Sequence, residues 1–451
     1  MTLPQDNWLA QRATACPDRL AVRWHGGDLT YAELDREAWA VAGRLTAAGV
    51  RSGEAVALAI PQGAEFACAL HGLMLLRAVA MPIGQRLTPG ERDAFLHRNR
   101  PDLVVASLDE LSGAGVHVDP LRLDPDAVLC RLETSGTAGF PKPVDLTYAN
   151  FLWSAVGSAL NLGIHPSDRW LCCLPLNHVG GLSILIRSVI FGTAAVVHDS
   201  FDVERVGASF AEDQVTVVSL VTTQLARLLE AGIDISGPRA IVLGGGAVPV
   251  DLIAEAEARG GRIVQTYGMT ETCSQVTTLA PSEARGRAGS AGRPGLGTEV
   301  RIEADEILVR GPVVAPGYTG AGGWLHTGDM GRIDEAGFLY VEGRLDDVII
   351  TGGENVMPEE VEAALLQHPD VEDAAVVGRP DPEWQEAVTA VVVLHDGATQ
   401  SDEALRAHCA RMLAGYKVPK DIEFMERLPR TASGKLRRRA LRLGEDEDGT
   451  S

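Results

Sequence analysis

The residues from 134 to 142 combine small hydroxyl side chains and glycines with a lysine, in the order Thr134-Ser135-Gly136-Thr137-Ala138-Gly139-Phe140-Pro141-Lys142. Because glycine has no Cβ, such a loop can bring backbone N–H groups and hydroxyls close around phosphate oxygens. The predicted phosphate ligands are Thr134, Ser135, Gly136, Thr137, Gly139 and Lys142. No lysine follows the second glycine, so the loop is not a P-loop. A turn-rich surface loop is the alternative that the segment alone leaves open.

A second candidate site follows the strand-like run RIVQT, at Tyr267-Gly268-Met269-Thr270-Glu271-Thr272. Loops that leave the carboxyl end of a parallel strand are where such sheets bind ligands. Tyr267 offers a ring face for stacking, Thr270 a hydroxyl, and Glu271 a carboxylate suited to a hard cation such as Mg²⁺. The alternative is a helix entry with Thr270 as its cap.

Two further motifs lie downstream. The run GWLHTGD ends at Asp329 and is followed by Arg344. A carboxylate in a glycine-bounded loop suits the two hydroxyls of a ribose, whereas a hairpin turn is the structural alternative. Lys435 lies in the basic stretch RTASGKLRRR near the end of an acidic chain. There it could reach a site where negative charge develops, although a solvated basic tail would look the same.

Short apolar strands alternate with helical patterns, which predicts an α/β fold with parallel sheets covered on both faces. Strands are expected at 54–60, 103–106, 193–197, 215–221, 240–243 and 262–266, and helices at 31–49, 64–81, 223–231 and 250–259. After about residue 285, short strands with glycine-rich turns predict a small antiparallel or barrel-like unit. After Arg344 a compact α+β unit is expected. We therefore predict a large N-terminal domain, 1–344, and a small C-terminal domain, 345–451, that carries Lys435.

The chain has 451 residues and a formal net charge of −21. A surface of that sign repels nucleic acid and anionic membranes, so neither is an expected partner. The seven cysteines are irregularly spaced without CxxC, and Cys172 and Cys173 lie in an apolar run. They fit buried thiols in a reducing cytoplasm better than zinc ligands or disulfides. No signal peptide or membrane span is expected, and the oligomeric state stays open, a homodimer included.

Each motif is weak alone, but their order resembles, from end to end, the adenylate-forming superfamily of acyl-CoA synthetases, peptide-synthetase adenylation domains and luciferases. The resemblance includes LTYAELDREAWAVAGRL, GGGAVP at 244–249, GRLDDVIITGGENVMPEEVE at 343–362 and the late PRTASGK. It implies ATP-dependent activation of a carboxylic acid through an acyl-adenylate, followed by transfer to CoA. ATP, Mg²⁺ and CoA are therefore the expected cofactor and co-substrates.

The resemblance also implies residue roles. The loop at 134–142 would hold the β- and γ-phosphates, Glu271 the Mg²⁺ ion, and Asp329 the ribose, with Arg344 also on the nucleotide. Lys435 would bridge the carboxylate and the α-phosphate during adenylation. The segments expected to frame the adenine and the acyl carboxylate comprise Gly244, Gly245, Gly246, Tyr267, Gly268, Met269 and Thr270.

A rotation of the C-terminal domain is also implied. Asp346 would be its hinge residue, or else an exposed turn residue. The rotation would replace Lys435 with a CoA site, for which the candidates are Gly352, Gly353, Glu354 and Trp384. The chain departs from the family at Ala138, Phe140 and Pro143, which weakens the phosphate-loop match, and at Gln385, where glycine is usual next to Trp384.

The stretch LPLNHVGGLSILIR at 174–187 resembles the o-succinylbenzoate–CoA ligases of menaquinone synthesis. That resemblance places His178, Gly181, Ser183 and Arg187 at the acyl pocket. His178 would be catalytic and Arg187 the cation for the second carboxylate of the substrate. The alternatives are a partly buried structural histidine and an exposed helical arginine. Asn177 replaces the usual aromatic residue, which leaves room for another acid, such as a benzoate. A stand-alone adenylation domain that loads a carrier protein, and a non-catalytic binding protein, are the remaining alternatives.

Overall fold

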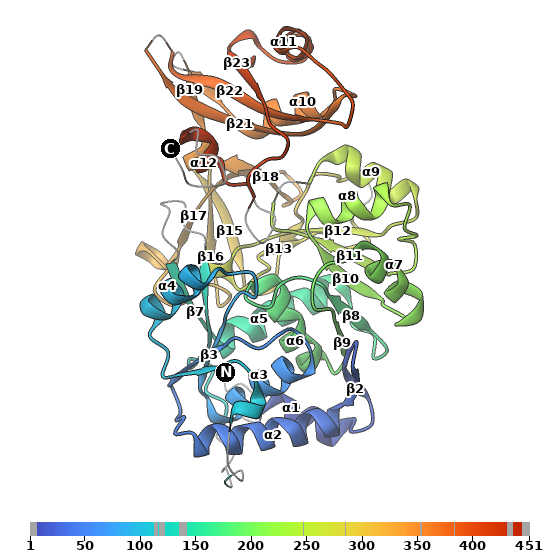
Figure 1. Cartoon of the computed structure of the whole chain (residues 1–451), viewed down its shortest axis with the longest axis vertical. Coiled ribbons are helices and arrows are strands. Elements are labelled where there is room, and N and C mark those ends of the chain that lie inside the picture. The colour runs from blue at the N-terminus through green and yellow to red at the C-terminus, as the bar shows by residue number, and fades with distance from the viewer. Residues whose placement is uncertain are drawn as a thin grey trace. The chain divides into compact units, whose positions relative to one another are not determined.

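The computed structural model describes residues 7–111, 116, 122–134, 142–246, 248–284, 286–351, 354–382, 384–430 and 436–443. Its contacts divide the chain into two compact units (Figure 1). The first unit comprises Met1–Arg301, Leu308–His326 and Glu335–Leu339, and the second comprises Ile302–Ile307, Thr327–Asp334 and Tyr340–Ser451. The predicted functional division after Arg344 stays a prediction.

A nine-stranded sheet forms the centre of the first unit. Its strands follow the order β14 (Arg293–Pro294), β13 (Thr277–Thr278), β12 (Ile263–Tyr267), β11 (Ala240–Leu243), β10 (Val217–Leu220), β8 (Arg169–Cys172), β9 (Ala194–Val197), β1 (Leu20–Trp24) and β2 (Gly27–Thr30). The run from β12 to β1 is parallel throughout, and only the strands at its two ends are antiparallel. The predicted parallel sheet is therefore confirmed.

Both faces of these parallel strands are buried, which explains their unbroken apolar sequences. Successive residues point to opposite faces. In β8, Leu171 packs into one hydrophobic cluster and Cys172 into another, and in β10 Val218 and Val217 divide in the same way. The ribbon shows helices on each side of this sheet (Figure 1). These helices are α1 (Trp8–Ala15), α2 (Tyr31–Ala47), α5 (Tyr148–Leu162), α6 (Val179–Phe191), α7 (Val203–Glu212), α8 (Thr222–Glu230) and α9 (Val250–Ala258).

A second sheet of the first unit has the order β5 (Leu103–Val105), β3 (Ala55–Leu58), β4 (Val79–Pro82), β6 (Val128–Thr134) and β7 (Lys142–Thr147). Helices α3 (Ala64–Leu76) and α4 (Pro89–Asn99) and the short helix η1 (Leu108–Glu110) accompany it. The prediction of one helix over 64–81 is wrong beyond Leu76. Arg77 adopts a left-handed conformation (φ 52°) that ends α3, and the chain continues into β4. Periodicity alone does not separate a buried helix from a buried strand that follows it directly.

The short strands expected after residue 285 exist. Strand β14 extends the large sheet, and a separate sheet has the order β15 (Glu299–Glu303), β16 (Glu306–Arg310), β17 (Leu325–Ile333) and β18 (Leu339–Arg344). The short helix η3 (Ala321–Gly323) precedes β17. The division between the two units runs through the residues of this sheet.

The rest of the second unit is the predicted α+β fold. Its five-stranded sheet contains β19 (Ile349–Thr351), β20 (Glu354–Val356), β21 (Val371–Asp381), β22 (Gln385–Leu394) and β23 (Asp421–Phe424). Helices α10 (Pro358–Leu366), α11 (Asp402–Ala410) and α12 (Arg438–Leu443) and the short helices η4 (Leu345–Asp347) and η5 (Gly415–Lys417) complete it. A core that includes Ile349, Val361, Val376 and Leu405 joins the sheet to α10 and α11.

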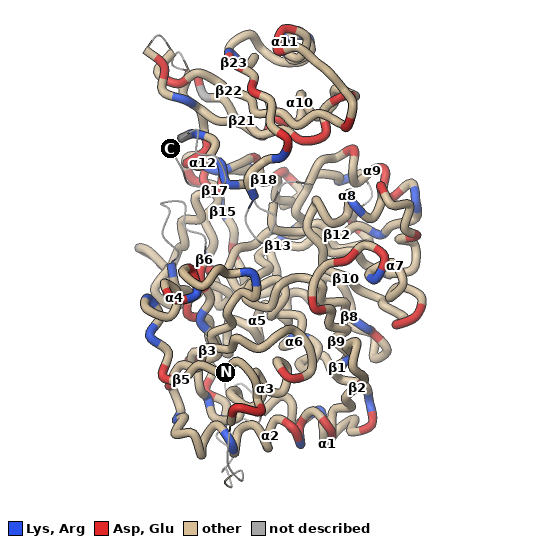
Figure 2. Tube along the Cα trace, in the orientation of Figure 1, with Lys and Arg blue, Asp and Glu red and all other residues tan. Residues whose placement is uncertain are grey.

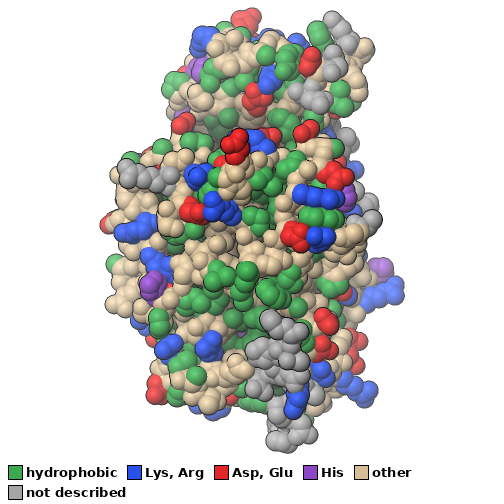
Figure 3. All heavy atoms as spheres, turned by 180° about the vertical axis from the view of Figure 1, so that it is seen from behind, with side chains coloured by type: hydrophobic (Ala, Val, Ile, Leu, Met, Phe, Trp, Pro, Cys, Tyr) green, Lys and Arg blue, Asp and Glu red, His purple; other side chains and the backbone are tan. Residues whose placement is uncertain are grey.

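Charged residues are rare along the buried elements of the first unit. The trace through α5, α6 and β8 to β10 carries few of them (Figure 2). On the face drawn in Figure 3, acidic and basic side chains are interspersed. The excess of negative charge is therefore not gathered there into one acidic surface.

Candidate active site

The loops that follow three parallel strands of the large sheet carry predicted site residues. His178 follows β8, Gly244 to Gly246 follow β11, and Tyr267 ends β12. Strand β10 pairs with both β8 and β11, and β11 pairs with β12, all in parallel. The carboxyl ends of these strands therefore share one edge of the sheet, which is where ligands of such sheets bind.

The turn after β12 is held in one shape by its own backbone. A Cβ on Gly268 would lie 1.8 Å from the carbonyl oxygen of Ser274, so only glycine fits. Met269 N–H donates to Thr272 Oγ1 at 3.0 Å, and a single helical turn, η2 (Thr270–Thr272), follows. Thr270 does not cap this turn, because Met269 occupies the N-cap position. Glu271 is thereby presented from a short hydrogen-bonded turn and is half-buried.

The ends of the phosphate-loop candidate lie beside that turn. Thr134 and Lys142 are paired across β6 and β7, whereas Ser135, Gly136, Thr137 and Gly139 lie outside the described residues. Strand β7 packs against η2. Tyr318 Oη donates to the carbonyl oxygen of Pro143 at 2.9 Å, and burial and the charge of Glu271 raise the pKa of that tyrosine. Tyr318 thus brings the loop ends next to the Glu271 carboxylate, an arrangement that fits a hard cation held together with phosphates.

Arg187 is a buried cation rather than an exposed helical residue. Its side chain on α6 is 2% exposed, and burial lowers its pKa to about 10. Arg187 Nη2 donates to Ser154 Oγ at 2.8 Å, and Ser154 Oγ donates to the carbonyl oxygen of Cys273 at 2.7 Å. Among the described residues, Arg187 Nε has no hydrogen-bond partner and no carboxylate forms an ion pair with the side chain. A buried guanidinium with a free donor is the group that an anionic ligand would need.

The rest of the acyl motif forms the start of α6. His178 is the N-cap residue and is half-buried. A Cβ on Gly181 would lie 2.5 Å from the carbonyl oxygen of Pro175, so this glycine lets the helix approach the preceding loop. Ser183 is fully buried, and its hydroxyl donates to the carbonyl oxygen of Gly180 at 3.3 Å. Two of the four candidates therefore have packing roles that the sequence did not indicate.

In the second unit, Asp329 and Arg344 lie together. Asp329 lies within β17, so the predicted loop is wrong, and Arg344 ends the neighbouring strand β18. Arg344 Nη1 lies 3.2 Å from Asp329 Oδ1. Gly328 takes a positive φ of 71°, which interrupts the regular strand just before the carboxylate. Asp329 N–H donates to Thr327 Oγ1 at 3.1 Å, which fixes the backbone on which the carboxylate sits.

Two family models match this chain. The model for AMP-binding enzymes matches residues 9–319, and that for the C-terminal domain of AMP-binding enzymes matches residues 360–435. The chain belongs to the AMP-binding enzyme family.

Relatives match this AMP-binding enzyme along its whole length. The 2-succinylbenzoate–CoA ligase of Bacillus licheniformis is 39% identical over 98% of this chain and 100% of its own length. The ligase of the same name from Geobacillus kaustophilus is 42% identical over 98% of both chains. The o-succinylbenzoate CoA synthetase of Bacillus subtilis, solved with its acyl-adenylate intermediate, superposes with a TM-score of 0.92 at 38% identity and covers 99% of both chains. The same enzyme has been solved with ATP and a magnesium ion, and there the TM-score is 0.90.

The candidate CoA residues of this AMP-binding enzyme are only partly described. Glu354 begins β20 and is exposed, and Lys420 Nζ lies 4.4 Å from the ring centre of Trp384. Gln385 has a φ of 70°, so it adopts the left-handed conformation for which the family's glycine is suited. Gly352, Gly353 and Lys435 lie outside the described residues, and Asp346 is exposed in the turn η4.

Sequence reasoning missed Ser154 and Tyr318. Each joins segments far apart in the chain, Ser154 between Arg187 and Cys273 and Tyr318 between Pro143 and the Glu271 turn. Neither stands in a motif, so nothing local marks it. In the part of the chain that the structure describes, no helix has the length and apolar character to cross a membrane.

Proposed function

We propose that this protein is an ATP-dependent 2-succinylbenzoate–CoA ligase. The observation that carries the proposal is the buried Arg187, whose free Nε suits the second carboxylate of a dicarboxylic acid. Relatives that share about two residues in five along the whole chain bear that name, as the 42% identity to the Geobacillus ligase illustrates. A cytoplasmic location is part of the proposal, supported by seven unpaired cysteines.

The reaction has two steps. In the first, a carboxylate oxygen attacks the α-phosphorus of ATP, an acyl-adenylate forms and pyrophosphate leaves. In the second, the CoA thiol attacks the acyl carbon, loses its proton, and AMP leaves as the thioester forms. The first step brings anions together, so donors and cations must neutralise the developing charge.

We assign roles from the family motifs that the residues match and, within one unit, from their neighbours. The ends of the 134–142 loop and Glu271 lie side by side, as expected for residues that hold phosphates and Mg²⁺, and Mg²⁺ would neutralise charge on the leaving pyrophosphate. Gly244, Gly245, Gly246 and Tyr267 at the sheet edge would frame the adenine. Asp329 would accept from the ribose hydroxyls beside Arg344. Lys435 would act in adenylation, and Trp384 and Glu354 in CoA binding.

The test measures pyrophosphate release over a panel of carboxylic acids, with and without CoA. Strong turnover of 2-succinylbenzoate that yields its CoA thioester supports the proposal. Turnover of a monocarboxylic benzoate without turnover of 2-succinylbenzoate would instead assign the chain to another aryl-CoA ligase, to which Asn177 points. Release that needs a carrier protein and ignores CoA would make it a carrier-loading enzyme.

The role of Lys435 is tested separately. Lys435→Ala should abolish pyrophosphate release and still convert a supplied acyl-adenylate to the thioester. Arg411→Gln, at an exposed end of α11, is the control for a lost cation in the same unit. Equal loss of both steps would contradict the alternating use of the C-terminal domain.

A further inference from the structure

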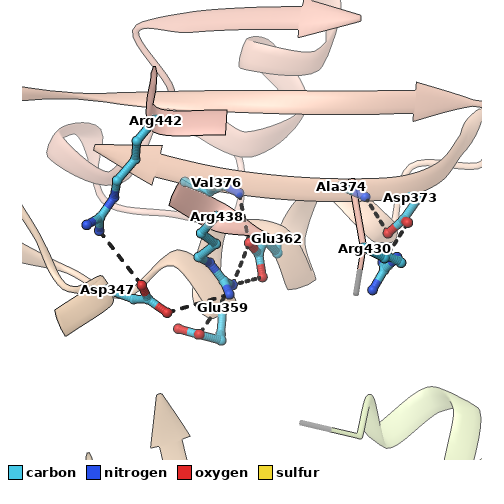
Figure 4. A network of polar contacts seen from close by, with 9 residues as sticks. All are labelled: Asp347, Glu359, Glu362, Asp373, Ala374, Val376, Arg430, Arg438 and Arg442. Carbon is cyan, nitrogen blue, oxygen red and sulfur yellow. Dashed lines mark hydrogen bonds and ion pairs between the residues drawn. The ribbon is translucent and has the colours of Figure 1, made fainter. Parts of the chain in front are cut away.

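Helix α12 begins at Arg438, three positions after Lys435, and its first residue is surrounded by acidic side chains (Figure 4). Arg438 Nη2 lies 2.7 Å from Glu362 Oε2 and 3.3 Å from Glu359 Oε1, both on α10. Arg438 Nη1 lies 3.8 Å from Asp347 Oδ2, in the turn η4. One guanidinium therefore connects α12, α10 and the hinge turn. The alternative of a solvated basic tail does not hold at this residue, whose side chain is 16% exposed.

The cluster is more than a surface ion pair. Burial opposes the charge of Arg438, but attraction to Glu362, Glu359 and Asp347 outweighs it and raises the pKa of the guanidinium. Glu362 Oε1 also accepts from the backbone N–H of Val376 at 2.8 Å, which ties the cluster to β21. Buried, multiply bonded charges hold a defined geometry, whereas exposed pairs contribute little.

A second arginine of the same helix contacts the hinge turn itself. Arg442 Nη2 donates to the carbonyl oxygen of Asp346 at 3.2 Å and lies 3.9 Å from Asp347 Oδ1. Arg438 and Arg442 are four positions apart, so they lie on one face of α12. Two residues of the turn η4, Asp346 and Asp347, are thus joined to α12.

The other end of the lysine segment is anchored as well. Arg430 pairs with Leu436 in an isolated antiparallel bridge, and Arg437 N–H donates to the carbonyl oxygen of Pro429 at 2.9 Å. Arg430 Nη2 also donates to Asp373 Oδ2 at 2.7 Å. The residues on either side of 431–435 are therefore joined to each other and to the domain.

We propose that Arg438, supported by Arg442, is a positioning residue that couples the hinge turn Leu345–Asp347 to the segment that carries Lys435. When the backbone turns at Asp346, α12 then moves with the domain as one body. The proposal rests on the proposed function for the role of Lys435. The contacts that connect α12 to the turn are present whatever that role is.

The experiment uses the full-length Arg438→Gln variant and measures the two half-reactions separately. Pyrophosphate release should fall about 100-fold in kcat, because a misplacement of about 1 Å at a reacting group costs that much. The conversion of supplied acyl-adenylate to thioester should change less than about twofold on the same reasoning, since that step does not use Lys435. Arg438→Lys should recover part of the loss. Arg411→Gln is the matched control.

A second readout does not depend on activity. Amide hydrogen exchange in 438–443 should accelerate in Arg438→Gln and, to a smaller degree, in Arg442→Gln, while exchange in α11 stays unchanged. Equal loss of both half-reactions, or unchanged exchange in α12, would overturn the coupling. If Arg438→Gln does not fold, Arg442→Gln, at a residue whose side chain is 31% exposed, provides the same comparison. If the wild-type protein activates no acid, the proposed function fails while the exchange measurement still decides the coupling.

Discussion

Arg187 and Ser154 form a hydrogen bond inside the larger unit, from Nη2 to Oγ over 2.8 Å. Ser154 Oγ in turn donates a hydrogen bond to the carbonyl oxygen of Cys273, which lies directly after the turn that carries Glu271. The proposed acid site and the proposed metal site are thus joined through one hydroxyl. Arg187 is also a buried charge that no described carboxylate balances, which is costly unless a ligand supplies the balance.

Replacing Arg187 with methionine should therefore weaken the use of 2-succinylbenzoate without lowering the stability of the protein. We expect kcat/KM for 2-succinylbenzoate to fall about 100-fold, since a hydrogen bond between charged groups is worth about 1.5–3 kcal/mol. The KM for ATP should change little. The melting temperature should not fall, because a buried unpaired cation is removed. Steady-state pyrophosphate release and thermal melts measure these quantities, and a parallel loss for acid and ATP would contradict the assignment.

Asp329→Asn should weaken recognition of the ribose. The variant keeps the size of the side chain but loses its charge, and Arg344 loses its ion-pair partner. We expect kcat/KM for ATP to fall at least about tenfold, the equivalent of about 1.4 kcal/mol. The preference of the wild-type enzyme for ATP over 2′-deoxy-ATP should shrink in the variant.

Asp305→Asn is the control for the change at Asp329. Asp305 is an exposed residue of the same unit with a positive φ of 66°, a conformation that asparagine tolerates. If both variants lose the same activity, or if the preference for the 2′-hydroxyl persists in Asp329→Asn, the ribose role is wrong.

Gln385→Gly should stabilise the protein slightly. Gln385 has a φ of 70°, and a left-handed backbone costs a residue with a side chain about 1–2 kcal/mol. The greater freedom of glycine in the unfolded chain offsets about 0.4–1 kcal/mol of that. We expect a gain of about 0.5 kcal/mol in the free energy of unfolding, visible in chemical denaturation. Gln385→Ala, which keeps a Cβ, should show no gain, and a loss of stability in Gln385→Gly would argue against strain.

Glu359 should make stability depend on pH. Burial raises the pKa of Glu359 from 4.5 to about 6, against the attraction to Arg438 and with the help of repulsion from Glu362. Its Oε2 atom has no hydrogen-bond partner among the described residues. A raised pKa means that folding binds a proton, so this contribution is complete below pH 4.5 and is lost as the pH rises through about 6.

The Glu359→Gln variant removes that dependence. As the pH rises from 4.5 to 7.5, the free energy of unfolding of the variant should increase by about 1–2 kcal/mol relative to that of the wild type. Denaturation curves at several pH values in one salt concentration measure the gain. A constant difference across that range would show that Glu359 is charged throughout, and a difference of opposite sign would show that its pair with Arg438 dominates.

Particular elements show which features the sequence pattern predicted and which it did not. The apolar runs of β9 to β12 predicted a parallel sheet, and the helical spacing over 31–49 predicted α2, which the structure begins with a capping box of Thr30 and Glu33. Where helix α3 and strand β4 followed each other with only Arg77 and Ala78 between them, the pattern merged them. Asp329 was expected in a loop because glycine often marks turns, yet the glycine interrupts a strand.

The order of the motifs was sufficient by itself to identify the family and to predict activation of a carboxylate with ATP, because those residues follow one another along the chain. The tertiary structure decided which charges are buried and what they meet. Arg187 proved to be enclosed with Ser154, and Arg438 proved to join Asp347 to Glu362. Periodicity records which way a side chain faces within its own element. The energy of a buried charge depends instead on groups that folding brings close from distant parts of the chain.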